Sequence, residues 1–262
     1  MSQKQKVKIL FVDIETSPIL GYVWGLWDND LALNQVKQDW HLLSFAAKWM
    51  GDKPSEIIYA DQRNAKDITN DKKLLEKIWK LLDEADIVIG QNSKAFDVKK
   101  LNARFILNGM QPPSSFRQID TMVLAKKYFA FSSNKLEFLT SNLCTKYKKL
   151  SHKKFPGFSL WSECLKGNKE AWKEMQLYNC HDTLATEELY QKLAAWDTSI
   201  NFDAYTDDLN HTCTCGHKEF ENKGYAYTSG GKFQRFKCKA CGKESRGRAN
   251  LLGIDKRRSM RR

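Results

Sequence analysis

A short apolar run near the start of the chain, Lys8–Ile14 (KILFVDI), constrains the fold most, because its β-branched and aromatic residues are typical of a buried strand. Two acidic side chains, Asp13 and Glu15, stand at the end of this run. A spacing of two places both carboxylates on the same face of a strand. Two acids beside an apolar strand cost stability unless a cation neutralises them. The pair is compatible with a cation site at the strand end, but taken alone such a pair is more often an acidic strand end that reaches solvent.

The elements that follow are strands first, and then helices and strands in alternation. The other expected strands are Leu42–Met50, Glu56–Ala60, Asp86–Gly90 and a short one before Asp120. The expected helices, from the helical spacing of apolar residues, are Lys73–Ala85, Ala95–Leu107, Asp120–Tyr128, Leu136–Tyr147 and Ala171–Trp196. The first three strands would form an antiparallel meander. This order predicts an α/β fold, a mixed sheet flanked by helices, so function must be inferred from sites rather than from architecture.

Length and hydropathy place the chain among globular proteins. A chain of 262 residues, 42% of them hydrophobic, allows one α/β domain plus a small appendage. No stretch approaches the roughly 18 apolar residues of a membrane span, and the polar start, Met1–Lys8, has no apolar signal segment. We therefore expect a cytoplasmic, intracellular protein with no membrane partner.

The net charge of +12 is concentrated at one end of the chain. Residues 232–262 contain twelve Lys or Arg against Glu244 and Asp255, a net charge of +10, which leaves +2 for the rest. A near-neutral body with a basic end favours a polyanionic partner, nucleic acid first. The alternative is a solvated tail that only aids solubility.

Two further acidic residues are candidate metal ligands, one after an expected strand and one on an expected helix. Phosphodiester hydrolysis near a charged phosphate can be carried out by two divalent ions about 3.5–4 Å apart, held by carboxylates, the oxygen ligands that Mg²⁺ prefers. Asp97 follows the buried strand in IGQNSKAFD, and Asp182 stands in LYNCHDT on the last long helix. Tyr178 lies four residues before Asp182, so the two share a helix face, where the hydroxyl could orient a water molecule. Each acid alone is more often structural, and the argument comes from the ordered combination.

These three motifs, FVDIETSP, IGQNSKAFD and YNCHDT, resemble those of the DEDD exonuclease superfamily, and specifically its tyrosine-bearing branch. The resemblance covers residues 7–195. It implies an RNase H-like fold, two Mg²⁺ or Mn²⁺ ions, and removal of nucleotides from a 3′ end. It further implies that the metal ligands are Asp13, Glu15, Asp97 and Asp182, and that Tyr178 orients the attacking water. Thr16 and Asn92 are candidate nucleic-acid contacts, although the Asn92 amide could equally serve the turn backbone.

Several positions depart from the family pattern. The histidine-bearing branch places His five residues before the last Asp, where this chain has Leu177. His181 is adjacent to Asp182 and points elsewhere on a regular helix, so we interpret it as a neighbour rather than the base. Gln91 stands where the family often has His, which leaves its role open, and Asp120 is expected to be structural.

Four cysteines near the C-terminus predict a second metal site. Cys213 and Cys215 form one pair, and Cys238 and Cys241 form a C-x-x-C-G knuckle that 22 residues separate from the first pair. Thiolates from two such pairs can close a tetrahedral, structural Zn²⁺ site, and the module resembles a zinc ribbon. Because one residue rather than two separates the first pair, His211 or His217 could replace one of its cysteines. Basic residues between aromatics in the expected hairpin, Lys232, Arg235 and Lys237, are candidate nucleic-acid contacts.

The sequence therefore predicts an RNase H-like domain at 1–197, a linker at 198–210, a zinc ribbon at 211–247 and a basic, disordered tail at 248–262. The expected activity is a 3′→5′ exonuclease on nucleic acid, with single-stranded or 3′-end DNA favoured over RNA. A polymerase or other replication protein is a further candidate partner. The rival hypothesis is a non-catalytic nucleic-acid-binding or adaptor protein that works through its ribbon.

Overall fold

A computed structural model describes residues 7–27, 30–148, 150, 154–205, 207 and 209–261. These residues form two compact units. The larger is Lys8–Leu189, and the smaller contains Tyr190–Arg262. The division falls inside the last long helix of the larger unit, several residues before the linker expected at 198–210. Part of that expected linker, Phe202–Tyr205, forms a short 3-10 helix in which Phe202 is buried.

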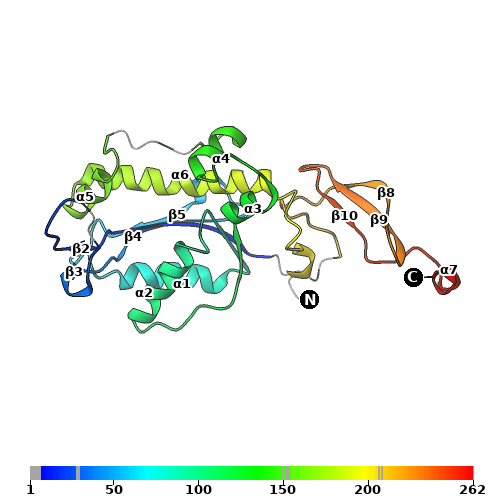
Figure 1. The fold of residues 1–262 in the computed structure, drawn as a ribbon, viewed down its shortest axis with the longest axis horizontal. Helices are drawn as coiled ribbons and strands as arrows, with labels where there is room; N and C mark the ends of the chain where they lie inside the picture. Colours follow the sequence, from blue (N-terminus) through cyan, green and yellow to red (C-terminus); the bar gives the residue numbers. More distant parts are fainter. Residues whose placement is uncertain are drawn as a thin grey trace. The chain divides into compact units, whose positions relative to one another are not determined.

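A five-stranded mixed sheet with the order β5-β4-β1-β6-β7 forms the centre of the larger unit (Figure 1). Its strands are β1 (Ile9–Thr16), β4 (Leu42–Trp49), β5 (Ile58–Asp61), β6 (Ile87–Gly90) and β7 (Arg117–Asp120). β1, β4 and β5 are antiparallel neighbours, which confirms the expected meander, and β6 and β7 continue parallel to β1. This is the mixed sheet flanked by helices, of the α/β class, that the sequence predicts.

Helices cover both faces of this sheet (Figure 1). They are α1 (Lys72–Glu84), α2 (Asp97–Leu107), α3 (Thr121–Tyr128), α4 (Leu136–Leu143), α5 (Ser159–Leu165) and α6 (Lys169–Leu193). On one face, Leu10, Val12 and Ile14 of β1 pack in one core with residues of α1 and α2. On the other, Leu43 of β4 packs with residues of α5 and α6. Since β1 alternates between these faces, its residues 11, 13 and 15 face α5 and α6.

The expected helix Leu136–Tyr147 is shorter than predicted, because α4 ends at Leu143. The backbone N–H groups of Thr145, Lys146 and Tyr147 donate instead to the carboxylate of Glu188 on α6, at 2.8–3.3 Å. A side chain from another element thus satisfies the donors that one more helical turn would have used. Such a partner, 41 to 43 residues away, leaves no mark on local periodicity.

A small hairpin between β1 and β4 was not predicted. Its strands β2 (Leu20–Gly21) and β3 (Val36–Gln38) pair antiparallel in a sheet of their own, and a 3-10 helix, Leu33–Gln35, precedes β3. A second 3-10 helix, Pro54–Glu56, follows β4 at the expected turn.

The smaller unit contains a three-stranded antiparallel sheet with the order β10-β9-β8. Its elements are β8 (Phe220–Thr228), β9 (Gly231–Cys238), β10 (Glu244–Arg246) and the helix α7 (Ile254–Ser259). The structure differs here from the disordered tail expected at 248–262. Leu251 N–H donates to the Lys232 carbonyl at 2.7 Å, and the Asn250 side chain bonds to both Gly230 and Lys232. These bonds to β9 order the first part of the basic segment, which its composition did not indicate.

Candidate functional site

Asp13 and Glu15 project from the central strand toward α5 and α6. β1 is hydrogen-bonded on both sides, with Asp13 opposite Ala46 and Glu15 opposite Ser44 of β4. Both acids are half-buried, whereas Val12 and Ile14, on either side of Asp13, are buried in the opposite core. The pairing register shifts between Glu15 and Thr16, so the regular strand ends just after the second acid. The two carboxylates therefore share one face, as their spacing predicts.

Asn179 of α6 holds the Asp13 carboxylate. Its Nδ2 donates to Asp13 Oδ2 at 2.6 Å and to the Asp13 carbonyl at 3.2 Å. Its own Oδ1 accepts from Ser44 Oγ at 3.0 Å, which fixes which end of the amide faces Asp13. Asn179 is fully buried. Sequence reasoning missed this residue, although its position three residues before Asp182 places it on the same helix face.

Trp161 of α5 holds the other acid of β1. Its indole Nε1 donates to Glu15 Oε2 at 3.1 Å. The same ring meets Tyr178 of α6 edge-on, with 6.2 Å between the ring centroids. Tyr178 is buried, and Trp161 therefore contacts both this tyrosine and Glu15. The sequence carried no signal for Trp161.

Asp97, the first residue of α2, lies against β1 from the other side of the strand end. Its Oδ1 accepts from the backbone N–H of Ile14, the residue between the two acids, at 3.1 Å. β1 and β6 are parallel, so their carboxyl ends lie at the same edge of the sheet, and α2 begins just beyond β6. Asp97 is 3% exposed, and this burial raises its pKa to about 7. A carboxylate here is therefore costly in the absence of a cation.

Asp182 lies on the buried face of α6 with Tyr178 and Asn179, and it is 3% exposed. Neighbouring His181 points elsewhere: its ring lies edge-on to Tyr147, 5.6 Å between centroids, and burial lowers its pKa. A neutral histidine packed against a tyrosine matches the interpretation of His181 as a neighbour.

The loop after β6 is held by Asp120 and Gln91. Asp120 accepts from the backbone N–H groups of Asn92, Lys94, Met122 and Val123, and so caps α3 and fixes the loop. Gln91 donates to the Asn134 carbonyl at 2.9 Å and accepts from the Thr121 hydroxyl. Both side chains are thus occupied with positioning the segment that leads into α2.

Asn92 stands apart in this loop because its φ is 60°, the one positive φ among the described non-glycine residues. Its carbonyl accepts from Ala95 and Phe96, which closes the turn before Asp97. The left-handed backbone that Asn tolerates better than most residues gives it a structural role. A nucleic-acid contact by its side chain stays a prediction.

The donor set fits hard divalent cations, since every expected ligand is a carboxylate oxygen. Three of the acids converge on one strand end: Asp13 and Glu15 from β1, and Asp97 through its bond to Ile14. Among the described residues, however, the one group of three or more candidate ligands close enough to hold a single ion is the cysteine cluster. Carboxylates without a cation repel one another, and a two-ion site divides its ligands between two positions.

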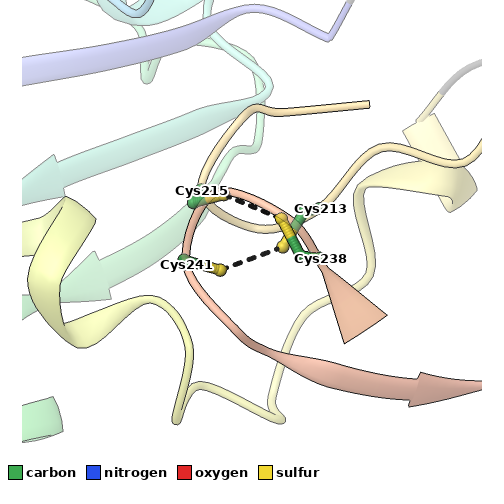
Figure 2. Close-up of side chains that lie close together, drawn as sticks. All are labelled: Cys213, Cys215, Cys238 and Cys241. Carbon is green, nitrogen blue, oxygen red and sulfur yellow. Dashed lines mark hydrogen bonds between the residues drawn. The ribbon is translucent and has the colours of Figure 1, made fainter. Parts of the chain in front are cut away.

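The four cysteines form that cluster in the smaller unit (Figure 2), with their sulfur atoms all within 4.8 Å of one another. Each pair sits in a turn that ends in a glycine of positive φ. Gly216 N–H donates to the Cys213 carbonyl at 2.8 Å, and Gly242 N–H to the Cys238 carbonyl at 3.0 Å. A residue other than glycine at either position would strain the turn. The C-x-C pair therefore closes a knuckle as the C-x-x-C pair does.

The sulfur spacing fits a tetrahedral ion. Sγ of Cys213 lies 3.5 Å from that of Cys241, and Sγ of Cys215 lies 3.7 Å from that of Cys238. Zn–S bonds of about 2.3 Å give tetrahedral edges of about 3.8 Å, whereas a disulfide requires about 2.05 Å. All the described cysteines are free thiols. Without an ion the thiols do not ionise together: a hydrogen bond with Cys215 lowers the pKa of Cys213 to about 5, while burial raises the pKa of Cys241 to about 11.

Neither candidate histidine belongs to the cluster. His211 pairs with Asp203 at 2.9 Å and is largely exposed. His217 Nδ1 lies 3.5 Å from Cys215 Sγ, as a contact to one thiol only. Of the alternatives left open by the sequence, the geometry favours four cysteines.

The basic residues of β9 and β10 have partners of their own. Lys232 Nζ lies 3.7 Å from the centre of the Tyr225 ring, and Arg246 lies over Phe233. The Arg235 guanidinium donates twice to the Lys223 carbonyl, at 3.0 and 3.1 Å. Lys237, opposite Glu244 in the β10–β9 register, is half-buried.

Comparison with known proteins establishes the class. Residues 46–194, more than half of the chain, match the RNase H superfamily, and the chain belongs to this superfamily. The matched region includes Asp97, Tyr178 and Asp182 but begins after Asp13 and Glu15.

A solved structure, that of the family B DNA polymerase from the hyperthermophilic archaeon Pyrobaculum calidifontis, is similar in fold. The TM-score is 0.52 at 13% sequence identity over 73% of this chain, which spans only about 25% of the polymerase. No curated protein matches the sequence. Within the described residues, every helix is too short or too polar to cross a lipid bilayer.

Proposed function

We propose that this protein is a metal-dependent 3′→5′ exonuclease that hydrolyses phosphodiester bonds from the 3′ ends of nucleic acid. One observation carries the proposal: the Asp97 carboxylate accepts from the backbone between Asp13 and Glu15. Residues far apart in the chain thus meet at one strand end. Asn179 brings α6, with Tyr178 and Asp182, against the same acids.

Asp13, Glu15, Asp97 and Asp182 would hold two Mg²⁺ or Mn²⁺ ions, which supply positive charge for the phosphate and acidify a water molecule when bound. The chain itself supplies orientation. Asn179 and Trp161 each donate to one carboxylate and so restrict how its oxygen atoms face a ligand. The Tyr178 hydroxyl would form a hydrogen bond to the attacking water and so orient it. The Tyr178 ring packs edge-on against Trp161, which restricts its position. Burial of Asp97 and Asp182 limits competing water at the site.

We favour DNA over RNA as substrate, because the motif FVDIETSP and the tyrosine at 178 resemble those of proofreading-type nucleases. The fold similarity to a DNA polymerase is compatible with this choice. A polymerase or other replication protein is a candidate partner.

The smaller unit would be a zinc ribbon that raises affinity for nucleic acid. Its four thiolates leave no position for a reacting ligand, so the ion would be structural. In this proposal the catalytic domain extends through residue 197, and residues 198–210 lead into the ribbon at 211–247.

The direct test is degradation of 5′-labelled single-stranded DNA and RNA of equal sequence with Mg²⁺ or Mn²⁺. The proposal expects a ladder that shortens from the 3′ end, faster on DNA, and no ladder with Asp13→Ala or Asp182→Ala. A 3′-labelled strand should release labelled mononucleotide first. Zinc-loaded, folded protein that cuts neither substrate would refute the proposal and favour the rival, a non-catalytic binding or adaptor protein.

A further inference from the structure

The hairpin that follows the first acidic motif exposes far more apolar surface than the rest of the larger unit. We define the aromatic hairpin as residues 18–40, of which 28 and 29 lie outside the described residues. Within it Trp24 is 100% exposed, Trp27 85% and Tyr22 66%. Three large rings facing solvent on one short segment mark a binding surface, because monomeric proteins rarely leave such patches uncovered.

A rigid clamp fixes this hairpin beside the acids. Ser17 and His41 form its two ends, and both are buried. Ser17 N–H donates to the His41 carbonyl at 2.9 Å, His41 N–H donates to Ser17 Oγ at 2.9 Å, and Ser17 Oγ lies 3.0 Å from His41 Nδ1. Ser17 comes two residues after Glu15, and the hairpin lies at the same end of the sheet as α5, which carries Trp161 (Figure 1). The hairpin that carries the exposed rings therefore begins and ends close to the candidate active site.

Among the described residues, two of the three cations that lie against rings of the hairpin stand at its base, on α2. Lys100, one turn after Asp97 on α2, places its Nζ 3.7 Å from the centre of the Trp40 ring, and Arg104 lies over the same ring. Lys37 lies 5.9 Å from the Tyr22 ring. The hairpin sequence itself contains three aspartates and this one lysine. Such a surface does not attract an anionic chain by charge, so the rings would supply its affinity.

We propose that the aromatic hairpin binds the unpaired segment of a polynucleotide just 5′ of the 3′ end, with Tyr22, Trp24 and Trp27 stacking on its bases. This inference rests on the proposed function for the identity of the substrate. A strand with its 3′ end on Asp13 and Glu15 has to leave across the neighbouring surface, and the clamped hairpin borders it. Stacking on aromatic side chains is tolerant of base identity and contributes substantially for each base.

Binding of fluorescent oligothymidylate to the full chain tests this, with Asp182→Asn in the background to prevent cleavage. Trp24→Ala and Trp27→Ala should each weaken binding roughly 5- to 10-fold, by the same factor at low and high salt, since stacking releases few counterions. An equally long strand with abasic sites should bind the parent weakly and be little affected by either change. Leu33→Ala is the matched control, because it removes exposed apolar surface from the same hairpin without removing a ring.

Equal losses on the abasic strand, an equal loss from Leu33→Ala, or no loss at all would overturn the inference and favour a protein partner for the hairpin. Hydrolysis of the p-nitrophenyl ester of thymidine 5′-phosphate by protein with Asp182 intact separates the two proposals. If the parent protein cleaves neither ester nor strand but the rings still bind bases, the exonuclease proposal fails and the binding surface stands.

Discussion

The Asn179 side chain donates a 2.6 Å hydrogen bond to Asp13, while Ser44 fixes the other end of the Asn179 amide. A helix is thereby joined to two strands at the carboxylate that the proposed mechanism needs most. Outer partners of this kind orient metal ligands, and their loss typically costs about 10- to 100-fold in metal affinity or activity.

Asn179→Ala should therefore lower exonuclease activity by roughly 10- to 100-fold and raise the Mg²⁺ concentration that gives half-maximal rate. The adjacent Leu177→Ala, at a largely exposed position, is the control and should leave both quantities unchanged. A fall in thermal stability without any change in the Mg²⁺ dependence would mean that Asn179 only supports the fold.

Two substitutions of Trp161 distinguish the effect of its hydrogen bond to Glu15 from that of its ring contact with Tyr178. Trp161→Phe removes the donor to Glu15 but keeps an aromatic edge for Tyr178. We expect a loss of activity of about tenfold, and a larger loss in Trp161→Ala, where Tyr178 also loses its neighbour. Steady-state rates at saturating Mg²⁺ measure both. Identical rates for Trp161→Phe and the parent would remove Trp161 from the site.

Asp97 should destabilise the metal-free protein but should be required for metal binding. Because burial raises the pKa of this carboxyl to about 7, the charged form is disfavoured at neutral pH in metal-free protein. Asp97→Asn keeps an oxygen acceptor for Ile14 N–H and removes the charge. It should stabilise the metal-free protein at pH 7, yet abolish activity and the rise in Tm on adding Mg²⁺ or Mn²⁺. Thermal melts with chelator and with metal test both parts. A variant less stable than the parent in chelator would contradict this.

The cysteine cluster should bind one zinc ion per chain. Elemental analysis should find it in the parent and in Cys180→Ser, and should not find it in Cys213→Ser or Cys241→Ser. Removal with a strong chelator should unfold the smaller unit, since metal binding supplies the folding energy of such modules, while residues 8–189 keep a separate melting transition. Zinc retained in both knuckle variants would exclude the four-thiolate site.

The basic residues of the ribbon should act by neutralising phosphates. For single strands the slope of log K against log salt changes by about 0.7 for each phosphate that a lysine or arginine neutralises. Replacing Lys232 and Lys237 together by Ala should therefore reduce the slope by about 1.4, and the exposed Lys77→Ala on α1 should not change it. Arg235→Ala should instead destabilise the pairing of β8 with β9, because the Arg235 guanidinium donates to the Lys223 carbonyl. An unchanged slope in the double variant would favour a protein partner for the ribbon.

Local patterns in the sequence predicted most of the elements. The apolar strand ending in Asp13 and Glu15, the meander and the long last helix all follow from periodicity within a dozen residues, which the core-facing residues of the structure match. The two cysteine pairs were equally visible, because thiolate ligands have a fixed spacing in the chain. Failures occurred where a distant side chain decides a local outcome, as when Glu188 takes the backbone donors of Thr145 to Tyr147 and ends α4 early.

The sequence by itself determined which chemical groups this protein has and in what order they occur. Only the tertiary structure decided which side chains orient them. Asn179 and Trp161 reach Asp13 and Glu15 across 166 and 146 residues of chain. Likewise, only the folded structure shows that the rings of the aromatic hairpin are exposed and that Ser17 and His41 join its two ends. Hydrogen bonds and burial depend on distance in space, and sequence separation carries almost no information about that distance until the chain has folded.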